Sequence, residues 1–307
     1  MSVVIGSRGS ALALWQANWA KAQLEGAHSG LQVEIKIIKT QGDRMAETPL
    51  AQIGGKEVWT KEIELALLEG KIDLAVHSLK DLPTVLPEGL ILGAVSPRED
   101  PRDALISQGD ILFQDLADGA TIATSSLRRQ AQLQHARPDL NFVEIRGNVD
   151  TRLRKLDTEN LDGIILAAAG LIRLGWGDRI SEAIDPEICV PAPGQAALGI
   201  EVRDHDARMS ALIEALNDVE THHAVCAERG MLEALGGGCR VPIGGWAVQD
   251  PKLETGLVLT GIVATPNGQT VIREVLSDES TNAVQLGKRV AAGLLEKGAG
   301  DILATLA

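Results

Sequence analysis

The residues best suited to covalent chemistry lie at positions 236–242, which read GGGCRVP. Three glycines end a helical stretch and allow positive φ, so Cys239 is expected on an exposed, bent loop. Arg240 beside it favours the thiolate, which is the nucleophilic form of cysteine. The alternative is a helix C-cap with an incidental cysteine, and these seven residues alone do not decide between the two.

A second chemical feature is a set of basic residues where helices are expected to begin. The first turn of a helix carries partial positive charge and normally attracts Asp and Glu. Basic residues stand at or beside these junctions instead: Arg8, Lys80, Arg128, Arg129, Arg146, Arg152 and Arg173, next to the capping hydroxyl residues Ser10, Thr124, Ser125 and Ser126. Any one of the arginines alone fits a solvated surface, but the set predicts a bound anion. Neither GxxxxGK[ST] nor GxGxxG occurs, which favours a multiply carboxylated ligand over a nucleotide.

Polar residues also follow the apolar strand that is expected at 72–77. His77 ends the strand, Lys80 and Asp81 come next, and Pro83 stops the turn. Ligands bind at the C-terminal ends of strands in α/β sheets, so we interpret Asp81 as a buried functional carboxylate. A capped turn is the alternative. We expect His77 itself to be a hydrogen-bonded core histidine rather than a ligand.

Composition limits the class of protein. The chain has 307 residues, 45% hydrophobic and 23% charged, which is typical of a globular protein with two or three domains. A net charge of −13 and a scarcity of aromatic residues argue against nucleic acid as a partner. We expect no signal peptide, membrane span, disulfide or metal site, and therefore a cytoplasmic protein. No large apolar stripe indicates assembly, so a monomer is expected.

Hydrophobic periodicity predicts an α/β fold. The strands and helices expected in a first lobe are 3–6, 10–25, 31–38, 60–69, 72–77 and 90–95. A proline-punctuated linker at 97–102 leads to a second lobe, whose expected elements are 121–123, 126–137, 141–145 and 161–168. A second linker at 191–195 precedes strand 196–202, which is expected to return to the first lobe, followed by helix 207–216.

From about residue 220 the pattern changes to a small α+β domain: helix 222–235, strands 245–248, 257–264 and 271–276, and helix 281–297. The predicted domains are lobe 1 at 1–97 and 196–217, lobe 2 at 101–191, and the α+β domain at 218–307. Two lobes with crossing linkers are typical of periplasmic-binding-protein folds. Residues 41–58 are expected to form a long mobile loop or lid, with Lys56 as a candidate ligand contact.

These motifs together resemble the porphobilinogen deaminase (hydroxymethylbilane synthase) family. Positions 228–244 are similar to the family signature around a cofactor-bearing cysteine, and further similar segments lie at 76–83, 124–130, 146–153, 166–175 and 191–195. The resemblance covers nearly the whole chain. Trp59 stands where the family is expected to carry phenylalanine, which bears on the packing of the 41–58 loop and not on the chemistry.

The resemblance implies a transferase of tetrapyrrole (haem, chlorophyll, cobalamin) biosynthesis. It would join four porphobilinogen units head to tail with loss of ammonia, giving hydroxymethylbilane, on a dipyrromethane primer held by a thioether to Cys239. Asp81 would be catalytic, stabilising the azafulvene left by ammonia loss and moving protons. The basic and hydroxyl residues named above would bind the acetate and propionate groups of the rings.

Two other functions stay open from the residues alone. A non-enzymatic anion-binding protein also has two lobes and crossing linkers, but has no need of a third domain with an exposed cysteine. A cysteine-nucleophile acyl transferase would need a histidine base near Cys239. His222 and His223 are close in sequence, although helix geometry does not obviously bring them to the loop.

Overall fold

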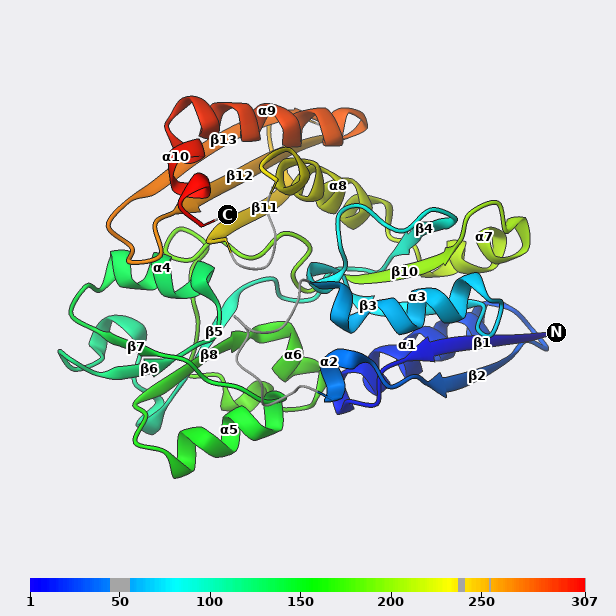
Figure 1. Ribbon diagram of the computed structural model, residues 1–307, viewed down its shortest axis with the longest axis horizontal. Helices are drawn as coiled ribbons and strands as arrows, with labels where there is room; N and C mark the ends of the chain where they lie inside the picture. The colour runs from blue at the N-terminus through cyan, green and yellow to red at the C-terminus, as the bar shows by residue number, and fades with distance from the viewer. Residues whose placement is uncertain (45–55, 237–240, 254, 307) are drawn as a thin grey trace. The chain divides into compact units, whose positions relative to one another are not determined.

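The computed structural model describes residues 1–44, 56–236, 241–253 and 255–306 (Figure 1). These form two compact units, 1–99 with 196–222 and 100–195 with 223–307. The chain passes from one unit to the other at 99/100, 195/196 and 222/223, and the first two passages lie within or beside the two expected linkers. The division into two lobes and a separate C-terminal domain stays a prediction, because unit 2 contains both the second lobe and most of the C-terminal region.

Unit 1 is built on a mixed five-stranded sheet in the order β2-β1-β3-β10-β4. Its strands are β1 (Ser2–Ser7), β2 (Gln32–Ile37), β3 (Leu74–Ser78), β4 (Leu90–Val95) and β10 (Leu198–Arg203). β1 is parallel to β2 and β3, whereas β10 runs antiparallel between β3 and β4. The expected return of the chain to the first lobe after the second linker is therefore confirmed.

Three helices of unit 1 begin within one residue of their predicted starts: α1 (Ala11–Ala27), α3 (Lys61–Leu68) and α7 (Ala207–Ile213). The short helix α2 (Gln41–Arg44) was not predicted. Ser10 caps α1, because its Oγ accepts the N–H of Ala13 at 3.3 Å. The prediction of a loop at 41–58 was wrong at both ends of that range. Residues 41–44 form α2, and the 3-10 helix η2 (Lys56–Trp59) begins at residue 56. The prediction for 45–55 lies outside the described residues.

The first sheet of unit 2 has the order β7-β6-β8-β5-β9. Its strands are β5 (Asp103–Ser107), β6 (Thr121–Ala123), β7 (Asn141–Val143), β8 (Gly163–Ala167) and β9 (Glu182–Ala183). β6 is parallel to β7 and β8, and β5 is antiparallel to β8 and β9. Helices α4 (Leu127–Ala136), α5 (Val149–Thr158) and α6 (Ala168–Arg173) follow β6, β7 and β8 in turn. The two α/β lobes of the predicted fold class are thus confirmed.

The C-terminal part of unit 2 is an antiparallel meander with helices packed against it. It contains β11 (Ile243–Gln249), β12 (Gly256–Ala264), β13 (Val271–Glu279), α9 (Ala283–Glu296) and α10 (Ala299–Ala304), together with residues 223–234 of α8 (Val219–Ala234). Met231 of α8 and Val290 of α9 share its core. Gly287 lets these helices meet closely, since a Cβ there would lie 2.2 Å from the carbonyl oxygen of Ala227. The small α+β arrangement is as predicted.

Candidate functional site

Two parallel strands of unit 1 bring four of the predicted site residues to one edge of its sheet. β1 and β3 are neighbours, so their C-terminal ends lie side by side. Arg8 and Ser10 follow β1, and Lys80 and Asp81 follow β3. Ligand sites of α/β sheets form at such ends. The topology thus places a guanidinium, an ammonium and a carboxylate along the same edge.

Asp81 is exposed, so its predicted burial was wrong. It ends the 3-10 helix η3 (Leu79–Asp81) directly after β3. In a 3-10 turn, residues three apart point the same way, and here Leu79 and Leu82 are both buried. The Leu79 N–H also donates to the carbonyl of Ala197 at 3.0 Å. These anchors leave Asp81 on the outer side of a fixed turn, where its carboxylate is open to a ligand.

His77 lies in the core immediately before that turn, as expected. Its Nε2 is 3.0 Å from Oε2 of Glu201 on β10, and the side chains are 7% and 0% exposed. The pair links β3 to β10 close to the turn that carries Asp81. Glu201 was not anticipated from the sequence. Its Oε1 is buried and contacts no hydrogen-bond partner in the described part of the chain.

Arg8 is engaged by an internal carboxylate. Its Nε and Nη2 donate to Oδ1 of Asp43 at 3.0 and 2.6 Å, and its guanidinium lies 4.3 Å from the centre of the Trp59 ring. Burial by itself would raise the pKa of Asp43, but the hydrogen bond and charge of Arg8, with hydrogen bonds from Thr40, lower it overall. The position of Lys56 is within η2, and the direction of its side chain stays a prediction.

In unit 2, the basic residues likewise follow parallel strands. β7, β6 and β8 are adjacent in the sheet. Arg146 follows β7, Arg128 and Arg129 follow β6, and Arg173 follows β8. Arg173 is 8% exposed at the end of α6. Arg152 on α5 donates from Nε to the carbonyl of Gly147 at 2.8 Å, so it lies against the turn that follows Arg146.

The hydroxyl residues after β6 form the start of α4. Ser126 is the N-cap, and its Oγ accepts the N–H of Arg129 at 3.4 Å. The Oγ1 of Thr124 accepts the N–H of Ser126 at 3.2 Å. Ser125 donates its own O–H to the carbonyl of Ile145. Thr124 and Ser126 therefore keep an O–H to donate, whereas Ser125 uses its O–H within the protein.

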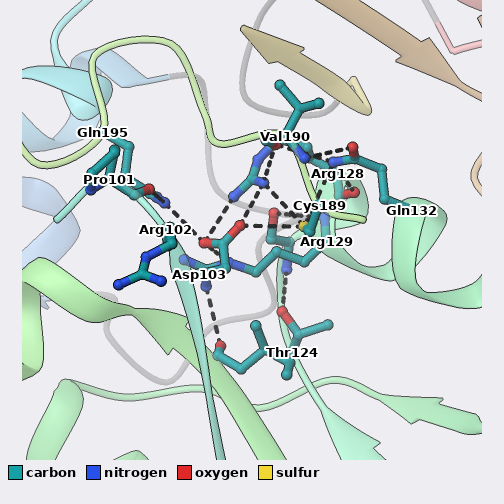
Figure 2. A network of polar contacts seen from close by, with 12 residues as sticks. Pro101, Arg102, Asp103, Thr124, Arg128, Arg129, Gln132, Cys189, Val190 and Gln195 are labelled. Carbon is teal, nitrogen blue, oxygen red and sulfur yellow. Dashed lines mark hydrogen bonds and ion pairs between the residues drawn. The ribbon is translucent and has the colours of Figure 1, made fainter. Parts of the chain in front are cut away.

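Arg128 and Arg129 converge on one buried carboxylate, Asp103 (Figure 2). Arg128 Nη1 donates to Oδ2 at 2.6 Å and Nη2 to Oδ1 at 3.2 Å, and Arg129 Nε donates to Oδ1 at 2.8 Å. Burial alone would raise the pKa of Asp103, but the two guanidinium charges outweigh it and hold that pKa well below its usual range. Sequence reasoning predicted an anion here and missed that the chain supplies one.

The sulfur of Cys189 also contacts this network, 3.3 Å from Asp103 Oδ2. Burial and the nearby Asp103 charge raise the pKa of this thiol. Cys189 is therefore an inert, neutral thiol. Cys239, the expected attachment residue, lies outside the described residues, and its role stays a prediction.

Comparison with known proteins identifies the relatives of this chain. Residues 3–211 match the family model "Porphobilinogen deaminase, dipyromethane cofactor binding domain", and residues 222–296 match "Porphobilinogen deaminase, C-terminal domain". Proteins called porphobilinogen deaminase are similar: 51% identical in Syntrophotalea carbinolica, 52% in Geobacter metallireducens and 48% in Bacillus subtilis. Each alignment covers 98% of this chain and 95%, 93% and 95% of those proteins, respectively.

Among solved structures, the methionine-binding protein MetQ is similar with a TM-score of 0.43 and 15% identity, over 72% of this chain and 92% of that one. The sequence matches, and not this likeness in structure, decide the family.

Proposed function

The chain belongs to the porphobilinogen deaminase family, and from that membership we propose how its residues divide the work of the reaction. The protein is a transferase of tetrapyrrole biosynthesis. It condenses four porphobilinogen molecules head to tail, with loss of ammonia, to hydroxymethylbilane, and uses a dipyrromethane cofactor. The similarity along nearly the whole chain carries this conclusion, and it replaces the alternatives of a binding protein and an acyl transferase.

Asp81 is the proposed catalytic carboxylate. Positive charge develops on the substrate pyrrole as ammonia leaves, and a carboxylate beside the pyrrole N–H stabilises that charge. The same group can accept a proton when the new carbon–carbon bond has formed. The exposed side chain, held by buried neighbours on both sides, supports this role.

The donor chemistry of the two sheet edges fits the cofactor. Dipyrromethane carries acetate and propionate groups, and guanidinium, ammonium and hydroxyl groups are suitable donors for carboxylates. We assign this binding to Arg8, Ser10, Lys80, Thr124, Ser126, Arg129, Arg146, Arg152 and Arg173. Bound through a thioether to Cys239, the cofactor would supply the pyrrole carbon to which the first substrate is joined.

Ser125, Arg128 and Lys56 are weaker candidates for direct binding. Ser125 donates its O–H to the carbonyl of Ile145, and both Nη atoms of Arg128 donate to Asp103. Their expected effect on ligand binding is therefore indirect, through the shape of the turn after β6. Lys56 is assigned a ligand contact from its position in η2 alone.

We also propose that the protein acts in the cytoplasm as a monomer on a small-molecule substrate, without nucleic acid or membrane. A chain with a net charge of −13 repels phosphate backbones. Within the described ranges, no helix is long and apolar enough to cross a membrane. Light scattering of the purified protein tests the monomer, for which a mass of 32.5 kDa plus the cofactor is expected.

Intact mass spectrometry tests the proposed function. The purified protein should carry the added mass of two pyrrole units, and Cys239→Ser should abolish it. Cys226→Ser is the matched control and should keep the added mass, because Cys226 has no role in attachment. Unmodified Cys239 in a protein that converts porphobilinogen at full rate would overturn the assignment of the cofactor site.

A further inference from the structure

The two adjacent arginines of α4 have different surroundings (Figure 2). Arg128 donates to both oxygens of Asp103, and its Nη1 also donates to the carbonyl of Val190 at 2.7 Å. Arg129 donates from Nε to Asp103 and from Nη1 to the carbonyl of Ile165 at 3.1 Å. Its Nη2 contacts no acceptor among the described residues. Both Nη groups of Arg128 thus donate to the protein, whereas Nη2 of Arg129 is left for a ligand.

The charges of the network do not cancel. It contains two guanidinium groups, 5% and 6% exposed, and a single carboxylate, Asp103, which is 0% exposed. Gln132 and Gln195 are uncharged, and burial keeps the Cys189 thiol neutral. A buried charge without a counter-ion is costly. The network therefore has one positive charge left to be neutralised by an anion from outside.

The carboxylate of Asp103 is held from several directions. Asp103 begins β5, and besides the arginines its Oδ1 accepts the Nε2 hydrogen of Gln195 at 2.9 Å. The same Gln195 nitrogen donates to the carbonyl of Pro101 at 2.7 Å. Residues from both expected linker regions therefore meet at this carboxylate. Because the carboxylate of Asp103 is held in place, it also fixes the direction of Arg129, whose Nε donates to it.

We propose that Asp103 is a positioning residue for ligand binding. Asp103 neutralises Arg128 and holds Arg129 through the Nε of Arg129. The two arginines then offer one binding site for a ligand carboxylate, at Nη2 of Arg129. That site would take an acetate or propionate of the cofactor or of the growing chain. The proposal rests on the proposed function, and it makes the two arginines unequal: Arg128 ties Asp103 to the chain at Val190, whereas Arg129 binds the ligand.

A suppressor experiment separates the two arginines. Arg128→Gln leaves Asp103 to neutralise Arg129, so cofactor occupancy, measured by intact mass, should fall. Adding Asp103→Asn returns one positive charge to Arg129 and should raise occupancy at least threefold above that of Arg128→Gln. The matched double variant, Arg129→Gln with Asp103→Asn, has the same net charge. The cofactor occupancy of this double variant should stay as low as that of Arg129→Gln, because the remaining guanidinium, of Arg128, donates to the carbonyl of Val190.

Two charge-preserving variants keep the proposal testable if a double variant does not fold. Lysine at position 128 can still pair with Asp103 as a point charge but loses the bidentate contact, so Arg128→Lys should lower cofactor occupancy less than Arg129→Lys does. Lysine at position 129 cannot contact Asp103 and the ligand together, so Arg129→Lys should lower occupancy and raise KM several-fold. Melting temperatures from circular dichroism identify the variants that fold.

Equal occupancy in the two lysine variants, equal recovery in the two double variants, or no recovery in either would overturn the proposal. These results differ from those expected if the proposed function itself were wrong. If it were wrong, the unaltered protein would carry no cofactor and would not consume porphobilinogen. A cofactor-loaded, active parent protein with the wrong pattern among the variants contradicts only the role of Asp103.

Discussion

The carboxylate of Asp43 holds the guanidinium of Arg8 in a fork of two hydrogen bonds, 3.0 and 2.6 Å long. The Trp59 ring lies against the same guanidinium, 4.3 Å from ring centre to Cζ. Because Arg8 is proposed to bind a ligand carboxylate, Asp43 competes with the ligand for this cation. Its lowered pKa keeps Asp43 charged at neutral pH, so the competition operates there.

We expect Asp43→Asn to lower KM for porphobilinogen with little change in kcat. Partly exposed ion pairs contribute about 0.2–1 kcal/mol, which corresponds to a fall in KM of about 1.4- to 5-fold. Steady-state kinetics at low ionic strength measure this. Asp139→Asn is the matched control, since it removes a surface pair with Arg137 of the same 2.6 Å length and should leave KM unchanged. A higher KM in Asp43→Asn would show that Asp43 helps Arg8 to bind.

Asp81→Asn should abolish turnover and leave the fold intact. Loss of a proton-transferring carboxylate lowers rates by about 100- to 10,000-fold. The side chain is exposed, so the melting temperature should change by no more than about 2 °C. Asp115→Asn is the control, because Asp115 is also exposed and also ends a 3-10 helix, η5 (Phe113–Asp115). Turnover within tenfold of the parent rate would remove Asp81 from the proposed role.

Local signals in the sequence predicted much of the fold. Ser10 and Ser126 were identified as the caps or starts of helices, and both are N-caps in the structure. The apolar run at 196–202 predicted β10, and the linker before it predicted its return to the first sheet. These features depend on a few consecutive residues, since caps, alternation and proline stops act over one or two turns of chain.

The acidic partners of the arginines could not be predicted in the same way. Asp103 lies 25 residues from Arg128, and Asp43 lies 35 residues from Arg8. A single aspartate has no local pattern that reveals a buried ion pair, and β5 was missed because it begins with that aspartate after a proline-rich linker. The predicted burial of Asp81 failed for a related reason, as the 3-10 turn directs Leu79 and Leu82 inward instead.

Cys189 should resist alkylation in the folded protein. Its side chain is buried, and burial and the Asp103 charge raise its pKa, so little thiolate is present at pH 8. Treatment with iodoacetamide, followed by digestion and mass spectrometry, should show no label on Cys189 until urea is added. Cys226 is less buried, and burial raises its pKa against a partial lowering by the Arg229 charge, so it should react slowly without urea. Rapid labelling of Cys189 in the native protein would contradict the buried network.

Asp103 should make a distinct contribution to acid stability. Its pKa in the folded protein is depressed below the unfolded value of about 3.9, so below that pH the unfolded chain binds more protons than the folded one. Its stabilising effect is therefore complete above about pH 4 and is lost as pH falls further. Removing one titrating group should flatten the slope of unfolding free energy against pH by up to about 1.4 kcal/mol per pH unit between about pH 3.5 and 2.5.

Urea unfolding of the Asp103→Asn variant and the parent at each pH measures this slope, with Asp115→Asn as a surface control that should leave it nearly unchanged. Equal slopes in Asp103→Asn and the parent would mean that Asp103 is not held as a carboxylate by Arg128 and Arg129.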